Sequence, residues 1–186
     1  MYKNFQLTPF GKASTEFAVE VKVQRIGNLL LLSFSLYDIQ QEVFWPEPSQ
    51  IMRQDFLWES TCFEAFIGSP NRTEYFEFNL SPSLSWNLYQ FKNYRSPKTL
   101  PPPHANESGV INVQVIDRTL HIILSLGAMN LAEQEIQLGL AAVIKTEDSL
   151  HYLALEHPRR EPDFHDSRYW TIKLPPYEEF HDSHGQ

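Results

Sequence analysis

The chain of 186 residues contains a single cysteine, Cys62, and no long run of apolar residues. One cysteine excludes an intrachain disulfide, which favours a reducing, cytoplasmic environment. No segment approaches the ~18 to 20 consecutive apolar residues of a transmembrane helix. The first residues, MYKNFQLTPFGKAS, lack the apolar stretch of a signal peptide. We therefore expect neither export nor a membrane partner.

Positive charge and catalytic motifs are also scarce. The chain carries 15 Lys and Arg against 23 Asp and Glu, a formal net charge of −8. Binding to nucleic acid requires a cationic face, so we expect no nucleic-acid partner. There is no phosphate loop, no dinucleotide glycine pattern, no Gly-x-Ser-x-Gly and no His-Glu-x-x-His. These absences make catalysis the weaker class of function.

The chain is rich in aromatic residues, at 13%, and in short segments of alternating polarity, and both features favour strands. Besides a strand that ends near Phe91, the expected strands are residues 16–23, 29–37, 61–67, 74–80, 110–116, 119–126, 137–145, 150–156 and 169–174. Only residues 127–135 carry the pattern of a short helix. The sequence thus predicts an all-β fold, an antiparallel β-sandwich of jelly-roll or immunoglobulin-like type with at most one or two short helices.

The proline-rich stretch of residues 96–109 predicts one long loop, because proline removes backbone donors and interrupts strand pairing. The chain is not divided there, since neither half has enough strands to close its own core. We expect a single domain over residues 1–176. Residues 177–186 are acidic and contain histidine, and they predict a disordered tail.

Two neighbouring strands are expected to place polar side chains on one face. Side chains alternate with period two along a strand, so the two faces can be assigned from the sequence. The apolar face comprises Phe63, Ala65, Ile67, Phe76, Phe78 and Leu80. The opposite face comprises Cys62, Glu64, Phe66, Tyr75, Glu77 and Asn79. A mixture of carboxylate, amide and aromatic groups suits a polar ligand better than a core.

A sugar is the ligand class that this mixture favours. Aromatic faces stack on the C–H side of a pyranose, and carboxylates and amides bind its hydroxyls. The predicted stacking residues are Trp58, Trp86 and Tyr89, and the predicted hydrogen-bonding residues are Glu64, Glu77 and Asn79. Structural roles stay open: the aromatic residues would fit a core, the two glutamates a solvated face, and the asparagine a strand end.

The segment EHPRREPDFHD, residues 156–166, has a histidine near each end, His157 and His165. In one interpretation His157 and His165 gate a ligand pocket, because sandwich loops cluster at the ends of the sheets. In a second, its arginines pair with nearby acids while the segment covers one end of the sandwich. In a third, His157, Asp163 and His165 hold a divalent metal, although their spacing matches no compact metal signature.

Residues 57–94 resemble the DOMON-like β-sandwich group, which includes the family-nine carbohydrate-binding modules. The resemblance is carried by Trp58-Glu59, by the acidic strand Cys62-Phe63-Glu64-Ala65-Phe66-Ile67 and by Tyr75-Phe76-Glu77-Phe78-Asn79-Leu80-Ser81-Pro82. A second segment, residues 154–165, resembles an uncharacterised bacterial branch of that group. The resemblance implies a sandwich that binds a ligand, with sugar or haem as the known ligands of the group, and implies no particular reaction.

The residues and the resemblance together predict a non-catalytic, cytoplasmic ligand-binding module for a carbohydrate or a sugar-containing small molecule, with no cofactor. One alternative is a haem-binding electron-transfer domain, although neither Met52 nor Met129 lies in an evident ligand motif. A second is a structural protein-interaction module whose partner the sequence does not identify. A third is a glycoside hydrolase using Glu64 and Glu77.

Overall fold

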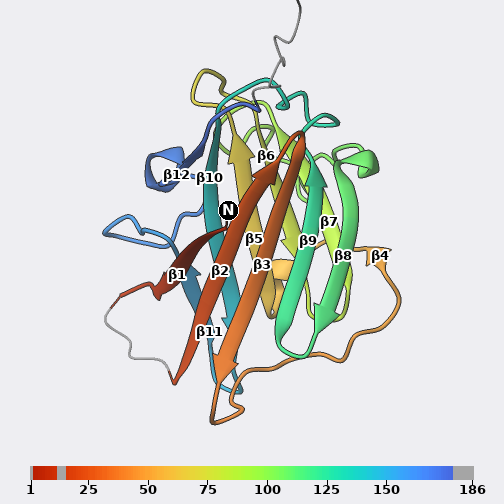
Figure 1. Cartoon of the computed structure of the whole chain (residues 1–186). Helices are drawn as coiled ribbons and strands as arrows, with labels where there is room; N and C mark the ends of the chain where they lie inside the picture. Colours follow the sequence, from red (N-terminus) through yellow and green to blue (C-terminus); the bar gives the residue numbers. More distant parts are fainter. Residues whose placement is uncertain (1, 12–15, 178–186) are drawn as a thin grey trace, which may run out of the picture.

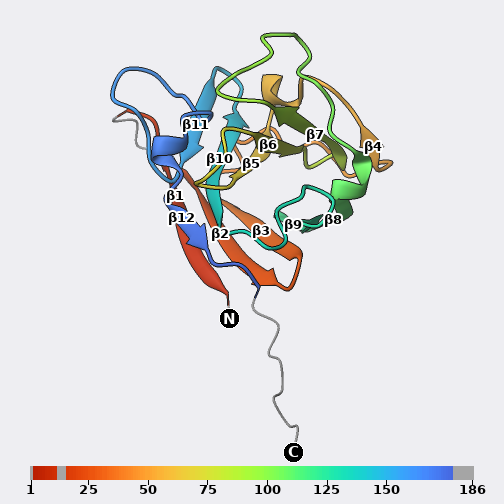
Figure 2. The same cartoon turned by 90° about the horizontal axis from the view of Figure 1, so that it is seen from above.

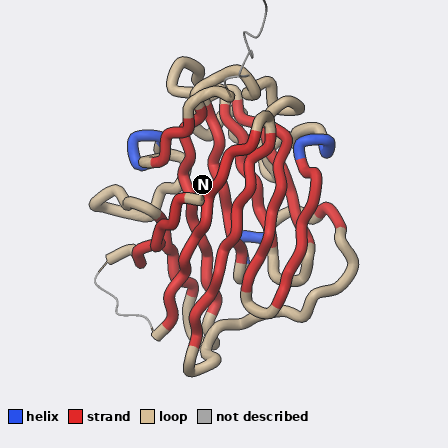
Figure 3. Tube along the Cα trace, viewed as in Figure 1, coloured by secondary structure: helices blue, strands red, loops and turns tan. Residues whose placement is uncertain are grey.

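The computed structural model describes residues 2–11 and 16–177, so the expected tail lies outside the described residues except for Tyr177. In these two ranges the chain forms twelve strands and three 3₁₀ helices of one turn each (Figure 1, Figure 3). The all-β prediction is confirmed. None of the helices in the described ranges is long and apolar enough to cross a membrane.

The strands form two layers that pack face to face (Figure 2). The first sheet runs, in spatial order, β1 (Lys3–Pro9), β2 (Phe17–Ile26), β3 (Leu29–Asp38), β9 (Thr119–Ser125) and β8 (Val110–Ile116). The second sheet runs β4 (Met52–Arg53), β7 (Ser85–Phe91), β6 (Tyr75–Leu80), β5 (Cys62–Gly68), β10 (Ile136–Lys145) and β11 (Leu150–Ala154). β12 (Ile172–Leu174) pairs with one end of β10. Strand β1 pairs with both β2 and β11 and so joins the two layers along one edge.

The main core lies between the two sheets and follows the period-two pattern of the strands. Alternate residues of β2 and β3 point into it, as in Val19, Val21 and Val23, which are fully buried. The second sheet contributes the predicted apolar face of Phe63, Ala65, Ile67, Phe76, Phe78 and Leu80. Two tight turns set the register of their hairpins, with Gly27 and Asp117 in the left-handed region, where glycine and aspartate are tolerated best.

Three local predictions differ from the structure. Residues 127–135 form successive turns, not a helix. Met129 and Leu131 of this segment, with Leu126 just before it, close one end of the core. Strands β1 and β4 were not expected, because β1 alternates weakly and β4 has only two residues. Strand β4 also pairs in parallel with β7, in a sheet that is otherwise antiparallel.

Candidate functional site

The second face of strands β5, β6 and β7, directed away from the main core, carries the polar side chains that the sequence placed there. We call this face the polar wall. It comprises Cys62, Glu64, Phe66, Tyr75, Glu77, Asn79, Asn87, Tyr89 and Phe91. Glu64 lies directly across from Asn79, and Glu77 lies between Phe66 and Tyr89, so the two glutamates are diagonal neighbours on adjacent strands.

Three segments cover the polar wall, which is why even its polar residues are buried. The 3₁₀ helix η1 (Leu57–Glu59) lays Trp58 against Tyr89, with ring centroids 5.9 Å apart. Residues 92–105, which we call the proline loop, extend over β7. Residues 156–171, which we call the histidine loop and which include η3 (Ser167–Tyr169), place Trp170 on Phe66. Aromatic contacts between these loops and the wall form a second, smaller apolar cluster.

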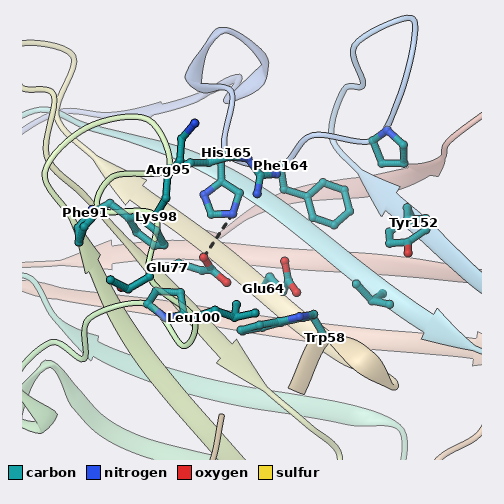
Figure 4. Close-up of a pocket in the computed structure, with 15 residues that line it drawn as sticks. Trp58, Glu64, Glu77, Phe91, Arg95, Lys98, Leu100, Tyr152, Phe164 and His165 are labelled. Atoms are coloured by element: carbon teal, nitrogen blue, oxygen red, sulfur yellow. Dashed lines mark ion pairs between the residues drawn. The ribbon is translucent and has the colours of Figure 1, made fainter. Parts of the chain in front are cut away.

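A cavity of about 640 Å³ remains between the polar wall and its covering loops (Figure 4). Glu64 and Glu77 form its floor, and Trp58 lies beside Glu64 (Figure 4). Its other lining residues are Phe91, Arg95, Pro97, Lys98, Thr99, Leu100, Pro102, Val143, Tyr152, Pro162, Phe164 and His165. The volume falls within the ~300 to 1,000 Å³ that is usual for small-molecule sites.

The two carboxyl groups on the floor are strongly shifted toward their neutral forms. Glu64 is 3% exposed and Glu77 is 4% exposed. Burial, followed by the charge of Glu77, raises the pKa of Glu64 well above its ordinary value of 4.5. Burial also raises the pKa of Glu77, to about 7, although Nδ2 of Asn79 donates to its Oε1 at 2.9 Å and favours the charged form.

His165 contacts both the floor and the wall. Its Nε2 lies 3.5 Å from Oε2 of Glu77, the contact drawn dashed in Figure 4, and its Nδ1 lies 2.7 Å from the hydroxyl of Tyr75. Burial lowers the pKa of His165 to about 3, so the imidazole is neutral at neutral pH and the contact with Glu77 is not an ion pair. Because Tyr75 accepts from the backbone N–H of Arg95, a tautomer with its proton on Nε2 satisfies both contacts.

The proline loop is tied down at both ends. At its start, Arg95 pairs with Asp163 of the histidine loop at 3.0 Å, and the hydroxyl of Tyr94 donates to the same carboxylate at 2.7 Å. At its end, His104 contacts Oδ1 of Asp55 at 2.8 Å. Tyr89 donates to the same oxygen, also at 2.8 Å. Burial opposes ionisation of Asp55, but its hydrogen bonds, led by the one from His104, outweigh this effect and lower its pKa.

The structure brings four of the eight predicted ligand-binding residues to the cavity: Trp58, Glu64, Glu77 and His165. Asn79 and Tyr89 lie on the same wall and support it, through contacts with Glu77 and Trp58 respectively. Trp86 projects from the other face of β7 and packs against the main core, under the guanidinium of Arg53.

His157 does not line the cavity either. Its Nε2 lies 2.7 Å from the backbone oxygen of Thr8 at the edge of the sandwich. In the ranges that the structure describes, no group of three or more His, Cys, Asp or Glu side chains could hold a metal ion. The set of His157, Asp163 and His165 is therefore not assembled as a metal site.

Sequence reasoning missed several residues that line the cavity. Phe91 could have been found, because it continues the alternation of Asn87 and Tyr89 along β7. Phe164 lies in the segment already singled out for its histidines. Arg95, Lys98 and Leu100 gave no signal, since the sequence does not show where the proline loop lies.

The fold is shared with solved structures. A presumed carbohydrate-binding protein from Bacteroides uniformis superposes with a TM-score of 0.72 at 12% sequence identity, over 95% of this chain and 87% of that one. A family 9 carbohydrate-binding module from Caldicellulosiruptor kristjanssonii, solved in complex with cellotriose, superposes with a TM-score of 0.53 at 9% identity, over 93% and 84% of the two chains.

No protein-family model matches the sequence, and no curated protein is similar enough to match. At these identities the two structures establish the fold alone. The chain thus has the β-sandwich architecture of family 9 modules, while the wider DOMON-like grouping stays a prediction.

Proposed function

We propose that this chain is a non-catalytic module that binds a carbohydrate, or a small molecule containing a sugar, in the cavity above Glu64 and Glu77. One observation carries the proposal: a cavity of small-molecule size has two buried carboxyl groups as its floor and aromatic rings around them. A sugar needs this combination, because its ring has apolar C–H faces and a polar edge of hydroxyl groups.

In this proposal Trp58 provides the stacking surface. It lies beside the floor, and edge-to-face contacts with the rings of Phe56 and Tyr89 fix its position. Phe91 and Phe164 close the sides of the cavity (Figure 4). Glu64 and Glu77 accept hydrogen bonds from hydroxyl groups, and Asn79 orients Glu77.

The arrangement of the two carboxyls favours binding over hydrolysis. A glycosidase places its two carboxyls on either side of the scissile bond. Glu64 and Glu77 instead project from the same face of one sheet, on adjacent strands. A sugar lying on this floor meets both groups from the same side.

The test is titration of the purified protein with neutral oligosaccharides, cellotriose among them, followed by tryptophan fluorescence and by calorimetry. Replacing Trp58 with alanine is expected to weaken binding about tenfold, the loss of roughly one aromatic stacking interaction. Trp86→Ala is the matched variant, since this indole lies on the opposite face of β7.

Equal losses in the two tryptophan variants would contradict the cavity as the site. Failure of all the sugars to bind would contradict the function. An absorption band of bound haem in the same preparation would favour the electron-transfer alternative, and release of reducing sugar on prolonged incubation would favour the hydrolase.

A further inference from the structure

When its two carboxyl groups are ionised, the floor offers a ligand only hydrogen-bond acceptors. Among the described residues, the hydrogen-bonding neighbour of the Glu64 carboxyl is the thiol of Cys62, a weak donor. Glu77 has one oxygen bonded by Asn79 and a second oxygen 3.5 Å from His165. A ligand that binds the ionised floor must therefore bring hydrogen-bond donors.

No lysine or arginine among the described residues is bonded to the floor, although the nearby charge of Arg95 partly offsets the rise in pKa that burial causes at both glutamates. Among the described residues, neither Glu64 nor Glu77 forms an ion pair with a lysine or an arginine. The guanidinium of Arg95 is already paired with Asp163. Lys98 lines the cavity from the proline loop, and His165 is neutral. Ionising two buried carboxyls that have no bonded cation is costly in a protein interior, and a bound cation reduces that cost.

Aromatic rings surround the same floor. Trp58 lies beside Glu64, and Phe91, Tyr152 and Phe164 line the walls above it (Figure 4). The face of an aromatic ring carries partial negative charge and attracts ammonium groups, with tryptophan the strongest. Carboxyls below and rings around them form an environment that suits a cation better than a neutral hydroxyl.

We infer that the ligand is a saccharide with a free amino group, bound with its ammonium against Glu64 and Glu77 and its ring on Trp58. This inference rests on the proposed function and names the chemical class of the ligand. An ammonium supplies three hydrogen-bond donors and one positive charge. These complement the ionised carboxyls of the floor, which only accept hydrogen bonds and carry negative charge. An aliphatic diamine also carries ammonium groups but has no sugar ring. It therefore distinguishes a site for amino sugars from a site for any organic ammonium.

The experiment uses calorimetry with three trisaccharides of the same β-1,4 linkage. They carry a hydroxyl, an acetamido group or a free amine at carbon 2, as in cellotriose, N-acetylated chitotriose and fully deacetylated chitotriose. The amine form is expected to bind ~10- to 100-fold more tightly than cellotriose. This is the gain in affinity that about one hydrogen bond between charged groups provides. A fourth titrant is 1,4-diaminobutane.

Proton release provides a second readout that does not depend on affinity. At about pH 6 an amine of this type is protonated, while the pKa of Glu77, raised to about 7, keeps that carboxyl largely neutral, and the pKa of Glu64 is raised as well. An ammonium favours the charged carboxylates, so its binding should release about one proton, measured as a difference in heat between two buffers. Cellotriose should release none.

Two variants locate the effect. Glu64→Gln keeps the size and the polar character of the side chain but cannot ionise. Combined with Glu77→Gln, which removes the other ionisable group of the floor, it should reduce the preference for the amine to less than about threefold and abolish the proton release, while cellotriose still binds. Glu133→Gln changes the same charge at an exposed position in the turns before β10, and it should leave the preference unchanged. Melting temperatures of both variants establish that each is folded.

The outcomes separate the inference from the proposed function. Cellotriose binding as tightly as the amine, or amine binding without proton release, overturns the ammonium assignment and leaves the sugar-binding function standing. Binding of diaminobutane without any sugar supports the ammonium site and overturns the sugar function. Failure of all four titrants overturns both.

Discussion

Replacing Glu77 with glutamine should make the protein more stable, by an amount that grows with pH. Burial holds the pKa of Glu77 at about 7 in the folded chain, whereas the unfolded chain returns it to an ordinary value near 4.5. Between these two values the folded state binds more protons than the unfolded state, so stability falls as pH rises. The favourable contribution of Glu77 to the free energy of unfolding is fully present below the unfolded pKa of 4.5 and is lost above the folded pKa of about 7. Each unit of difference corresponds to about 1.4 kcal/mol, so the full effect is about 3 kcal/mol.

His165 has a pH dependence of the opposite sign. Its pKa is lowered to about 3 in the folded state, so its contribution is lost as pH falls below its ordinary value of 6.5. The effect of Glu77 is therefore isolated by subtracting the wild-type stability from that of the variant at each pH. This subtraction largely removes the titration of groups that both chains share.

The assay is urea unfolding between about pH 4.5 and pH 7.5, with the free energy of unfolding obtained by linear extrapolation. The free energy of unfolding of Glu77→Gln minus that of the wild type should rise by about 3 kcal/mol across this range. The difference for the exposed Glu133→Gln should stay level, since solvent screens that charge. A level difference for Glu77→Gln would refute the reasoning, because it would mean that this buried carboxyl ionises as it does in water.

Three further predictions concern the polar wall and the segments that cover it. Gly139→Ala should lower the free energy of unfolding by about 1–3 kcal/mol in urea, because the added Cβ would overlap the indole of Trp170. Cys62 should not react with a thiol reagent in the native protein and should react fully in denaturant, since it is buried and burial raises the pKa of its thiol. Asp55→Ala should cost about 1–3 kcal/mol in the same unfolding assay, because it leaves the buried hydroxyl of Tyr89 without its acceptor.

Much of the polar wall could be predicted because strand periodicity is a local property. The alternation in β5 and β6 assigned Glu64 and Glu77 to one face and Phe63 and Phe78 to the other, as the structure has them. The same rule should have separated two residues of β7. Trp86 and Tyr89 are three positions apart and therefore point to opposite faces, so they could not both stack on one ligand.

The covering loops could not be predicted, because their positions depend on contacts between residues that are distant in sequence. Arg95 is held by Asp163, 68 positions later in the chain, and Tyr75 bonds His165, 90 positions later. No local pattern encodes such pairs. The helix predicted at residues 127–135 fails for a related reason: packing of Met129 and Leu131 into the end of the core overrides a weak local preference.

The sequence by itself determined the all-β class, most of the strands, their turns and the side of the sheet on which each side chain lies. These features follow from period-two alternation and from turn residues, which act over a few positions. Only the tertiary structure decided that the polar wall is covered by η1, the proline loop and the histidine loop. This cover changes the chemistry of the site. A carboxyl on an open face ionises in water, whereas burial under the covering segments raises the pKa values of Glu64 and Glu77.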